Sequence, residues 1–435
     1  MRFLHAIIAL LLPVGLGNCH ASEDEDIDKR PPNIIVIMMG DIGRDWLSCY
    51  GSNHDTPNID RLAENGLKYR TAWSAPKSTP ACVSLLTGMY PFHHGWTRHY
   101  DVPRWGGDGL KPDRFTTFAS ILRDSGYSTG IAGQWLLNDL KSQPNALKEH
   151  GFDEYSIWTG DQHTTVELGE QNKNGYLIQH QVRRESPNTP DAVNQFALDF
   201  IQQHREKPFL LYYPMLSTLR PIEADFSSFS KYVTDVDQRV GKLIQSVQKL
   251  GLIDHSLIIL TSDNGSAVAG KLNGQDFIEG KGQRTDVGVH VPFIVRADFL
   301  TPHPGLESFD LVDVTDVYPT LLELAAIDVP TEIIIDGKSL IPSLSGDEDP
   351  FKKRNWIFSQ LGEFRMIRDW QYMLDTEQGC YHLEDDPLQN KNLYHSKERI
   401  IPGRRARLQK ILDRLPKNTT APFDAFELKY PAPTQ

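Results

Sequence analysis

Two aspartates directly follow long apolar runs of the chain, at positions where α/β enzymes place their chemistry. Residues 33–39 precede Gly40-Asp41, and residues 257–261 precede Ser262 and Asp263. In open α/β sheets, ligands bind outside the carboxyl ends of the strands. We therefore expect Asp41 and Asp263 at a functional site. A simple turn after a strand is the alternative interpretation for the Asp-Asn-Gly sequence that begins at Asp263.

The cysteines offer little chemistry of their own. Cys19 lies near the N-terminus, and Cys49, Cys82 and Cys380 lie in the body of the chain, with no Cys-x-x-Cys spacing. Zinc sites usually need clustered Cys or His ligands, so a zinc site is not expected. The three body cysteines allow at most one disulfide, and three buried thiols fit the sequence equally well.

The elements that position these residues alternate between strands and helices. Apolar runs at 33–39, 209–213, 257–261 and 291–295 are unbroken rather than alternating, which indicates strands buried on both faces. A helix is expected from Pro57, with Thr56 as its cap and Gly66 as its stop, and another from Lys231 to Leu250. The pattern predicts an α/β fold, a doubly wound, mainly parallel sheet flanked by helices.

The pattern changes after about Gly346. Short strand-like pieces at 356–358, 366–367 and 371–374 precede a helical stretch at 400–415. We predict a small C-terminal antiparallel α+β subdomain. The expected organisation is a signal peptide at 1–21, an acidic linker at 22–31, an α/β domain at 32–346, the subdomain at 347–416 and a tail at 417–435.

The composition is that of an acidic globular protein. The 435 residues include 45 Lys and Arg against 57 Asp and Glu, so the net charge is −12. A 39% hydrophobic content is ample for a large core and excludes global disorder. The acidic balance, without a long basic run, argues against nucleic acid as a partner.

The N-terminus has the features of an export signal. Arg2 precedes an apolar stretch from Phe3 to Leu16, and small residues allow cleavage after Ala21. A lipoprotein signal acylated at Cys19 is less favoured, because Asn18 is large for the position before the acylated cysteine. No other segment is long and apolar enough to span a bilayer. The sequence predicts a periplasmic or secreted protein without a transmembrane span.

A set of short motifs resembles the sulfatase family of the alkaline-phosphatase superfamily, in the order in which that family carries them. The pieces are Pro32 to Met38, Leu47-Ser48-Cys49-Tyr50-Gly51, Thr56 to Ala63, Pro80 with Leu85 to Pro91, Thr261 to Gly265, Gly280-Lys281-Gly282 with Gly288 to Pro292, and Leu383 to Leu388. Each piece is weak alone, but the ordered set covers most of the chain and is specific.

The resemblance implies an arylsulfatase-like or glycan-directed sulfuric ester hydrolase. In the family a Cys or Ser is oxidised to formylglycine, whose hydrate attacks the sulfur. That residue corresponds to Ser78, which taken alone would be the capped start of a helix. Asp41, Asp263 and Asn264 match the family's ligands for a divalent cation, usually calcium. Lys281, otherwise a plain loop cation, matches a lysine that binds the sulfate ester.

Several positions depart from the family pattern. Gly40 replaces an aspartate ligand, which should weaken calcium binding, and Cys82 stands where the motif after Ser78 has arginine. The sequence Gly-Gln-Trp-Leu at 133–136 replaces a family Gly-Lys-Trp-His, and Leu219 replaces a further histidine. Leucine cannot donate a proton and glutamine carries no charge. The cations Lys77 and Arg220 lie close enough in sequence to compensate.

Three functions remain open at the level of sequence. The first is a sulfatase that acts on a sulfate ester, expected to be a sulfated carbohydrate, through formylglycine at Ser78. The second is a catalytically inactive sulfatase-like protein that binds a sulfated glycan or a protein partner. The third, less favoured because it needs two metals, is phosphoester transfer by unmodified Ser78.

Overall fold

The computed structural model describes residues 30–158, 176–179, 182–185, 189–216 and 225–419. The described residues from Pro31 onward group into a single unit. The predicted signal peptide at 1–21, nearly all of the acidic linker and Leu219 with Arg220 lie outside the described residues. Among the described residues, no helix is both long and apolar enough to cross a membrane.

A ten-stranded sheet forms the centre of the fold, in the order β12-β2-β11-β8-β1-β7-β3-β4-β5-β6. Its central strands β8, β1, β7, β3 and β4 run parallel, as the apolar runs predict. The strands are β1 Asn33–Met39, β2 Leu67–Trp73, β3 Ser128–Gln134, β4 Glu154–Trp158, β5 Tyr176–Gln179, β6 Val182–Glu185, β7 Phe209–Pro214, β8 Ser256–Ser262, β11 Phe293–Arg296 and β12 Leu306–Asp313.

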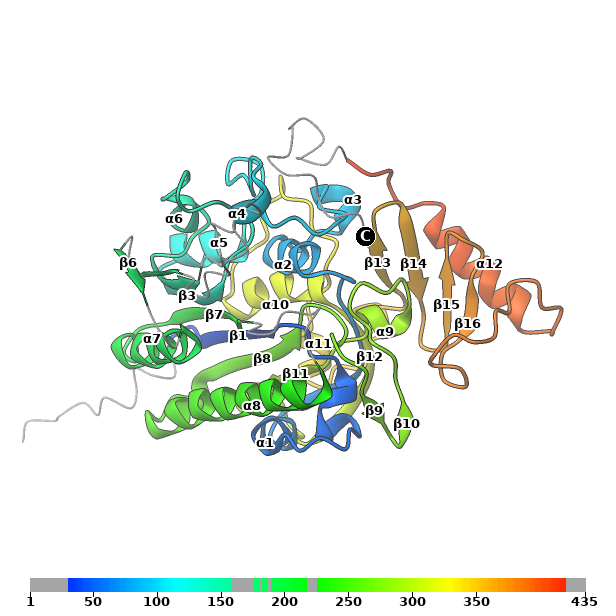
Figure 1. Ribbon diagram of the computed structural model, residues 1–435, viewed down its shortest axis with the longest axis horizontal. Coiled ribbons are helices and arrows are strands. Elements are labelled where there is room, and N and C mark those ends of the chain that lie inside the picture. The colour runs from blue at the N-terminus through cyan, green and yellow to red at the C-terminus, as the bar shows by residue number, and fades with distance from the viewer. Residues whose placement is uncertain (1–29, 159–175, 180–181, 186–188, 217–224, 420–435) are drawn as a thin grey trace, which may run out of the picture. The chain divides into compact units, whose positions relative to one another are not determined.

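Helices cover both faces of this sheet (Figure 1). Alternate residues of β1 enter two hydrophobic clusters. Ile34, Val36 and Met38 pack with α2, α5 and α10, while Ile35, Ile37 and Met39 pack with α1, α7 and α8. The helices are α1 Pro57–Glu64, α2 Ser78–Thr87, α3 Pro91–His94, α4 Val102–Trp105, α5 Phe118–Asp124, α6 Ala146–Glu149, α7 Thr189–Gln203, α8 Phe226–Lys249, α9 Asp286–Val289, α10 Val317–Leu324 and α11 Ile341–Leu344.

Three expectations about these elements need correction. The helix expected from Lys231 is α8, which begins five residues earlier because Asp225 caps it by accepting a hydrogen bond from the Ser228 amide. The strand expected at 291–295 is β11, which begins at Phe293 and runs antiparallel to both its neighbours. Pro292 has no amide hydrogen, which accounts for the later start.

The third correction concerns the start of α1. Thr56 precedes the helix, but its side chain caps no amide of the first turn. The carboxylate of Asp237, from the neighbouring α8, instead accepts hydrogen bonds from the amides of Asn58 (3.0 Å) and Ile59 (2.9 Å). Thr56 is held by Ser48. The cap is therefore tertiary, and a local sequence pattern could not reveal it.

The C-terminal part forms the predicted antiparallel sheet with a helix. The hairpin β9 Lys271–Leu272 and β10 Gln275–Asp276 lies apart from both larger sheets, between the end of β8 and α9. The C-terminal sheet has the order β13-β14-β15-β16, and α12 contacts its strands. The bounds are β13 Ile357–Leu361, β14 Phe364–Arg368, β15 Tyr372–Asp375, β16 Cys380–His382 and α12 Ile401–Leu412.

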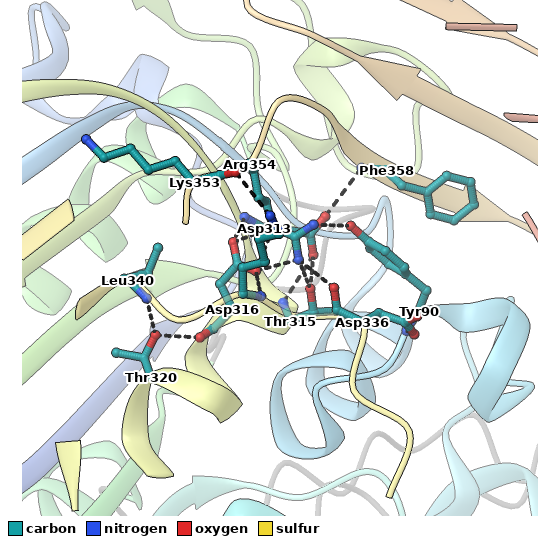
Figure 2. Close-up of polar contacts among 11 residues, drawn as sticks. Tyr90, Asp313, Thr315, Asp316, Thr320, Asp336, Leu340, Lys353, Arg354 and Phe358 are labelled. Carbon is teal, nitrogen blue, oxygen red and sulfur yellow. Dashed lines mark hydrogen bonds and ion pairs between the residues drawn. The ribbon is translucent and has the colours of Figure 1, made fainter. Parts of the chain in front are cut away.

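The buried guanidinium of Arg354 joins the four-stranded C-terminal sheet to the ten-stranded sheet (Figure 2). Arg354, just before β13, is 7% exposed and donates from Nε to both carboxylate oxygens of Asp316 at 2.7 and 2.8 Å. It also donates to the Tyr90 hydroxyl, the Thr315 hydroxyl and the Asp336 carbonyl. Because these groups come from segments far apart in the chain, the cluster fixes where β13 meets the end of β12.

Candidate functional site

The carboxyl ends of β1 and β8 bring Asp41, Asp263 and Asn264 together. The two strands pair in parallel, with Met39 opposite Ser262. One carboxylate oxygen of Asp263 accepts the backbone amides of Asp41 and Asn264, both at 2.8 Å. The Asn264 side chain donates to Asp41 Oδ1 at 3.0 Å. The three residues that the family resemblance implies as cation ligands therefore form one connected group.

The backbone at Asp41 has an uncommon conformation. Its φ is +62°, in the left-handed region that residues other than glycine seldom adopt. Its amide is bound by Asp263 and its carbonyl accepts from the Ala267 amide, so the surrounding structure holds it there. Such strain persists only where neighbours enforce it, and it occurs often at functional sites.

Ser78 contacts this group from a separate segment of the chain. It is the first residue of α2, and its hydroxyl donates to Asn264 Oδ1 at 3.2 Å. The Ser74 hydroxyl donates to the Asp263 carbonyl at 2.6 Å and ties the segment before α2 to the end of β8. The start of α2 also carries the positive end of its helix dipole, which favours an anion near Ser78.

Lys281 completes the group. Its ammonium lies 2.6 Å from Asp41 Oδ2 and its side chain is 18% exposed. The loop that carries it is held by the carbonyl of Ser266, which accepts the amides of Gly280 and Lys281. The five residues named from the sequence thus come together at one place, although they are up to 240 residues apart.

The electrostatics of this group favour a bound cation. Burial raises the pKa of Asp263 to about 6, with repulsion from Asp41 adding to it and Lys281 opposing it. Asp41 and Asp263 are 3% and 7% exposed. A divalent cation would relieve the repulsion between the two carboxylates, and its hard oxygen ligands would come from Asp41, Asp263 and Asn264. The residues present fit such an ion.

Those positions departing from the family pattern that fall within the described residues lie at the same edge. Gln134 ends β3, which runs parallel to β1 through β7, and the partly buried Leu136 follows it. The carbonyl of Gly40 accepts from the Tyr232 hydroxyl. Cys82 is partly buried, and burial raises its pKa to about 12, with repulsion from Asp263 contributing. A thiol with this pKa is not an effective nucleophile at neutral pH.

The histidine and aspartate that follow Lys281 in the sequence have structural partners. His290 lies 2.8 Å from Asp286, and Asp286 also receives Arg368 of β14 at 2.8 Å and the Trp73 indole. Burial by itself would raise the pKa of Asp286. The neighbouring His290 and Arg368 outweigh burial and hold this pKa well below its usual value. This buried cluster joins the loop after Lys281 to the C-terminal sheet.

The three body cysteines, all within the described residues, are free thiols. Cys380 is buried, and Cys49 and Cys82 are partly buried. Of the two arrangements that the sequence left open, the structure therefore has three thiols rather than a disulfide.

Comparison with known proteins connects this chain to one family. The family model described as Sulfatase matches residues 32–327. The chain is 30% identical over 380 residues to N-acetylgalactosamine-6-sulfatase of Canis lupus familiaris, a match that covers 79% of this chain and 70% of that protein. It is 26% identical to arylsulfatase D of Homo sapiens, covering 82% of this chain and 76% of that protein.

Solved structures share the fold. Ps i-CgsB in complex with k-i-k-neocarrahexaose aligns with a TM-score of 0.74 and 25% identity, over 88% of this chain and 93% of that one. BT4656 in complex with its substrate D-glucosamine-2-N,6-O-disulfate aligns with a TM-score of 0.69 and 19% identity, over 88% of this chain and 97% of that one. At the latter identity the likeness concerns the fold alone.

Proposed function

The chain belongs to the sulfatase family, and we propose that it hydrolyses a sulfate ester with Ser78, converted to formylglycine, as the source of its nucleophile. One observation carries the proposal. Ser78, Asp41, Asp263, Asn264 and Lys281 reach one point at the carboxyl edge of the sheet from separate segments. An alkaline-phosphatase-like sheet with helices on both faces holds them there.

The nucleophile is oriented by its neighbours. Once converted to formylglycine and hydrated, Ser78 would supply a hydroxyl that attacks the sulfur atom, and the S–O bond to the alcohol would break. The second hydroxyl of the hydrate would then expel sulfate and restore the aldehyde. Asn264 Oδ1, 3.2 Å from the Ser78 hydroxyl, accepts a hydrogen bond from that group and directs it. The first turn of α2 favours the negative charge that develops on the sulfate oxygens.

Asp41, Asp263 and Asn264 would hold a divalent cation, with calcium the expected ion. When bound, it would neutralise charge on the sulfate and on the attacking oxygen. Lys281 contributes a further positive charge. Its ammonium has three donors, so it can keep its bond to Asp41 and still donate to a sulfate oxygen.

The leaving alcohol receives less assistance. Leu136 has no proton to donate, and Leu219, outside the described residues, has none either. General acid catalysis typically contributes about 10²–10⁴-fold to rate. The chain should therefore hydrolyse esters of acidic alcohols, such as aryl sulfates, more readily than esters of sugar hydroxyls.

We propose a sulfated carbohydrate as the natural substrate class. Support comes from the name of the canine relative and from the k-i-k-neocarrahexaose bound in the Ps i-CgsB structure. Export through residues 1–21 is part of the proposal, since it would deliver the protein to the periplasm or the medium, where such polysaccharides are met.

A second function is favoured by the substitutions at the site. Gln134 supplies no positive charge to a sulfate group, and Leu136 supplies no proton to a leaving alcohol. These features suit a protein that binds a sulfated glycan or a protein partner without turnover.

The decisive test is the mass of the peptide that contains Ser78, from protein purified from its own host. A loss of two hydrogens is expected, since conversion to formylglycine oxidises the Ser78 alcohol to an aldehyde. Hydrolysis of 4-nitrophenyl sulfate should then disappear in Ser78→Ala. An unmodified serine, or activity unchanged in Ser78→Ala, would reject the proposed nucleophile and leave the binding function.

A further inference from the structure

A second lysine, Lys77, lies at the site beside Lys281. It occupies the N-cap position of α2 in an extended conformation, directly before Ser78, and its side chain makes no capping hydrogen bond. The backbone amide of Gly282 donates to the carbonyl of Pro76 at 2.8 Å, which brings the Lys77 and Lys281 segments together. The two side chains therefore approach the same group of carboxylates from two different loops.

The Lys77 ammonium occupies space that only a glycine leaves open. A Cβ atom added at Gly282 would lie 2.7 Å from Lys77 Nζ, and Gly282 has a φ of +80°. The side chain is half-buried rather than extended into solvent. Burial lowers the pKa of Lys77, with repulsion from Lys281 contributing, while Asp41 and Glu279 oppose the shift. Lys77 is thus close enough to Lys281 and Asp41 for their charges to act on it.

Lys77 differs from the neighbouring cations in its partners. Lys281 is paired with Asp41, Arg284 with Glu377 and Lys271 with Asp276. Within the described residues, the Lys77 ammonium makes no hydrogen bond or ion pair with a protein group. A half-buried ammonium without such a partner is available to an anion, and burial makes each charge–charge contact stronger than it is in water.

The other charges around the site are compatible with an additional positive charge at Lys77. Asp41 and Asp263 contribute two negative charges, Lys281 offsets one of them, and Gln134 at the end of β3 is neutral. With a divalent cation bound between the carboxylates the pocket is already positive overall, and Lys77 adds a further positive charge. An anionic sulfate group complements that charge.

We propose that Lys77 is a sulfate-binding residue of this site and donates to an oxygen of the sulfate group next to Ser78. The inference rests on the proposed function, because it assigns the ligand of the same site. Lys77 precedes the nucleophile directly, and its charge interacts with those of Lys281 and Asp41 in the same group of residues. It provides the charge that Gln134 does not.

The test is the affinity of the full chain for inorganic sulfate, measured by titration calorimetry at constant ionic strength adjusted with sodium chloride. Lys77→Gln removes the charge, Lys77→Arg retains it, and Lys242→Gln removes an equal charge from the exposed face of α8. Charge-assisted hydrogen bonds are strong enough that Kd should rise roughly tenfold or more in Lys77→Gln. Lys77→Arg should stay within about threefold of the unaltered chain, since it keeps the positive charge, and Lys242→Gln should leave Kd unchanged.

The role of Lys77 would be overturned if Lys77→Gln and the unaltered chain bound sulfate with equal affinity. It would also be overturned if neither the unaltered chain nor any variant showed saturable binding of sulfate. Neither result depends on turnover. Failure of the proposed hydrolysis would instead appear as an unmodified Ser78 in the host protein. Circular dichroism of each variant verifies that it is folded before its affinity is compared.

Discussion

At the scale of single residues, Leu136 is the substitution with the clearest chemical consequence. It follows Gln134 at the carboxyl edge of the sheet and cannot protonate a departing alcohol. In Leu136→His, hydrolysis of a sugar sulfate should rise by about tenfold or more, within the range known for general acids. Hydrolysis of 4-nitrophenyl sulfate should change little, because nitrophenolate leaves without help. Steady-state rates on both substrates measure the contrast.

The double variant Ser78→Ala with Leu136→His is the control, and it should hydrolyse neither ester. An equal gain on both substrates would contradict the assignment, because it would mean that the new histidine acts on binding rather than on the leaving group.

At the scale of elements, α1 depends on α8 for its start. Asp237 accepts the amides of Asn58 and Ile59 and also the Asn58 side chain at 2.7 Å. Asp237→Ala leaves these donors without partners and should lower the free energy of unfolding by about 1–3 kcal/mol. Asp237→Asn keeps one acceptor oxygen and should cost less. Urea unfolding of both variants measures the difference, and an equal loss in the two would contradict capping as the cause.

At the scale of the whole molecule, the cluster in Figure 2 links stability to pH. Burial raises the pKa of Asp313 to about 7; Arg354 opposes the shift and Asp316 adds to it. Between its ordinary value of 3.8 and about 7, the folded chain keeps a proton that the unfolded chain has released. Asp313 therefore contributes stability at low pH that is lost as the pH rises through this window.

Asp313→Asn cannot ionise and should not show that loss. Compared with that of the unaltered chain, the free energy of unfolding of Asp313→Asn should therefore increase as the pH rises from 5 to 8. Ser308→Ala, a neutral change on the same strand β12, should shift the free energy equally at both values. Urea unfolding at the two pH values provides the comparison, and parallel changes in Asp313→Asn would contradict the linkage.

Sequence was sufficient for the family, the fold class and most of the central strands. Strands buried on both faces are unbroken apolar runs, and the runs at 33–39, 209–213 and 257–261 fall within β1, β7 and β8. The family motifs are short and local, and their order is visible in one chain. The same motifs named Ser78, Lys281, Asp41, Asp263 and Asn264, whose roles in catalysis stay predictions.

Only the tertiary structure decided which of these groups touch and what else joins them. The pair Lys281–Asp41 and the cap that Asp237 provides for α1 connect residues 240 and 179 positions apart. The sequence pointed to Lys77 as a cation next to Ser78, but its position against Gly282 and Lys281 is visible only in the structure. Side-chain hydrogen bonds and electrostatic energies depend on distance in space, so they are determined only once the chain has folded.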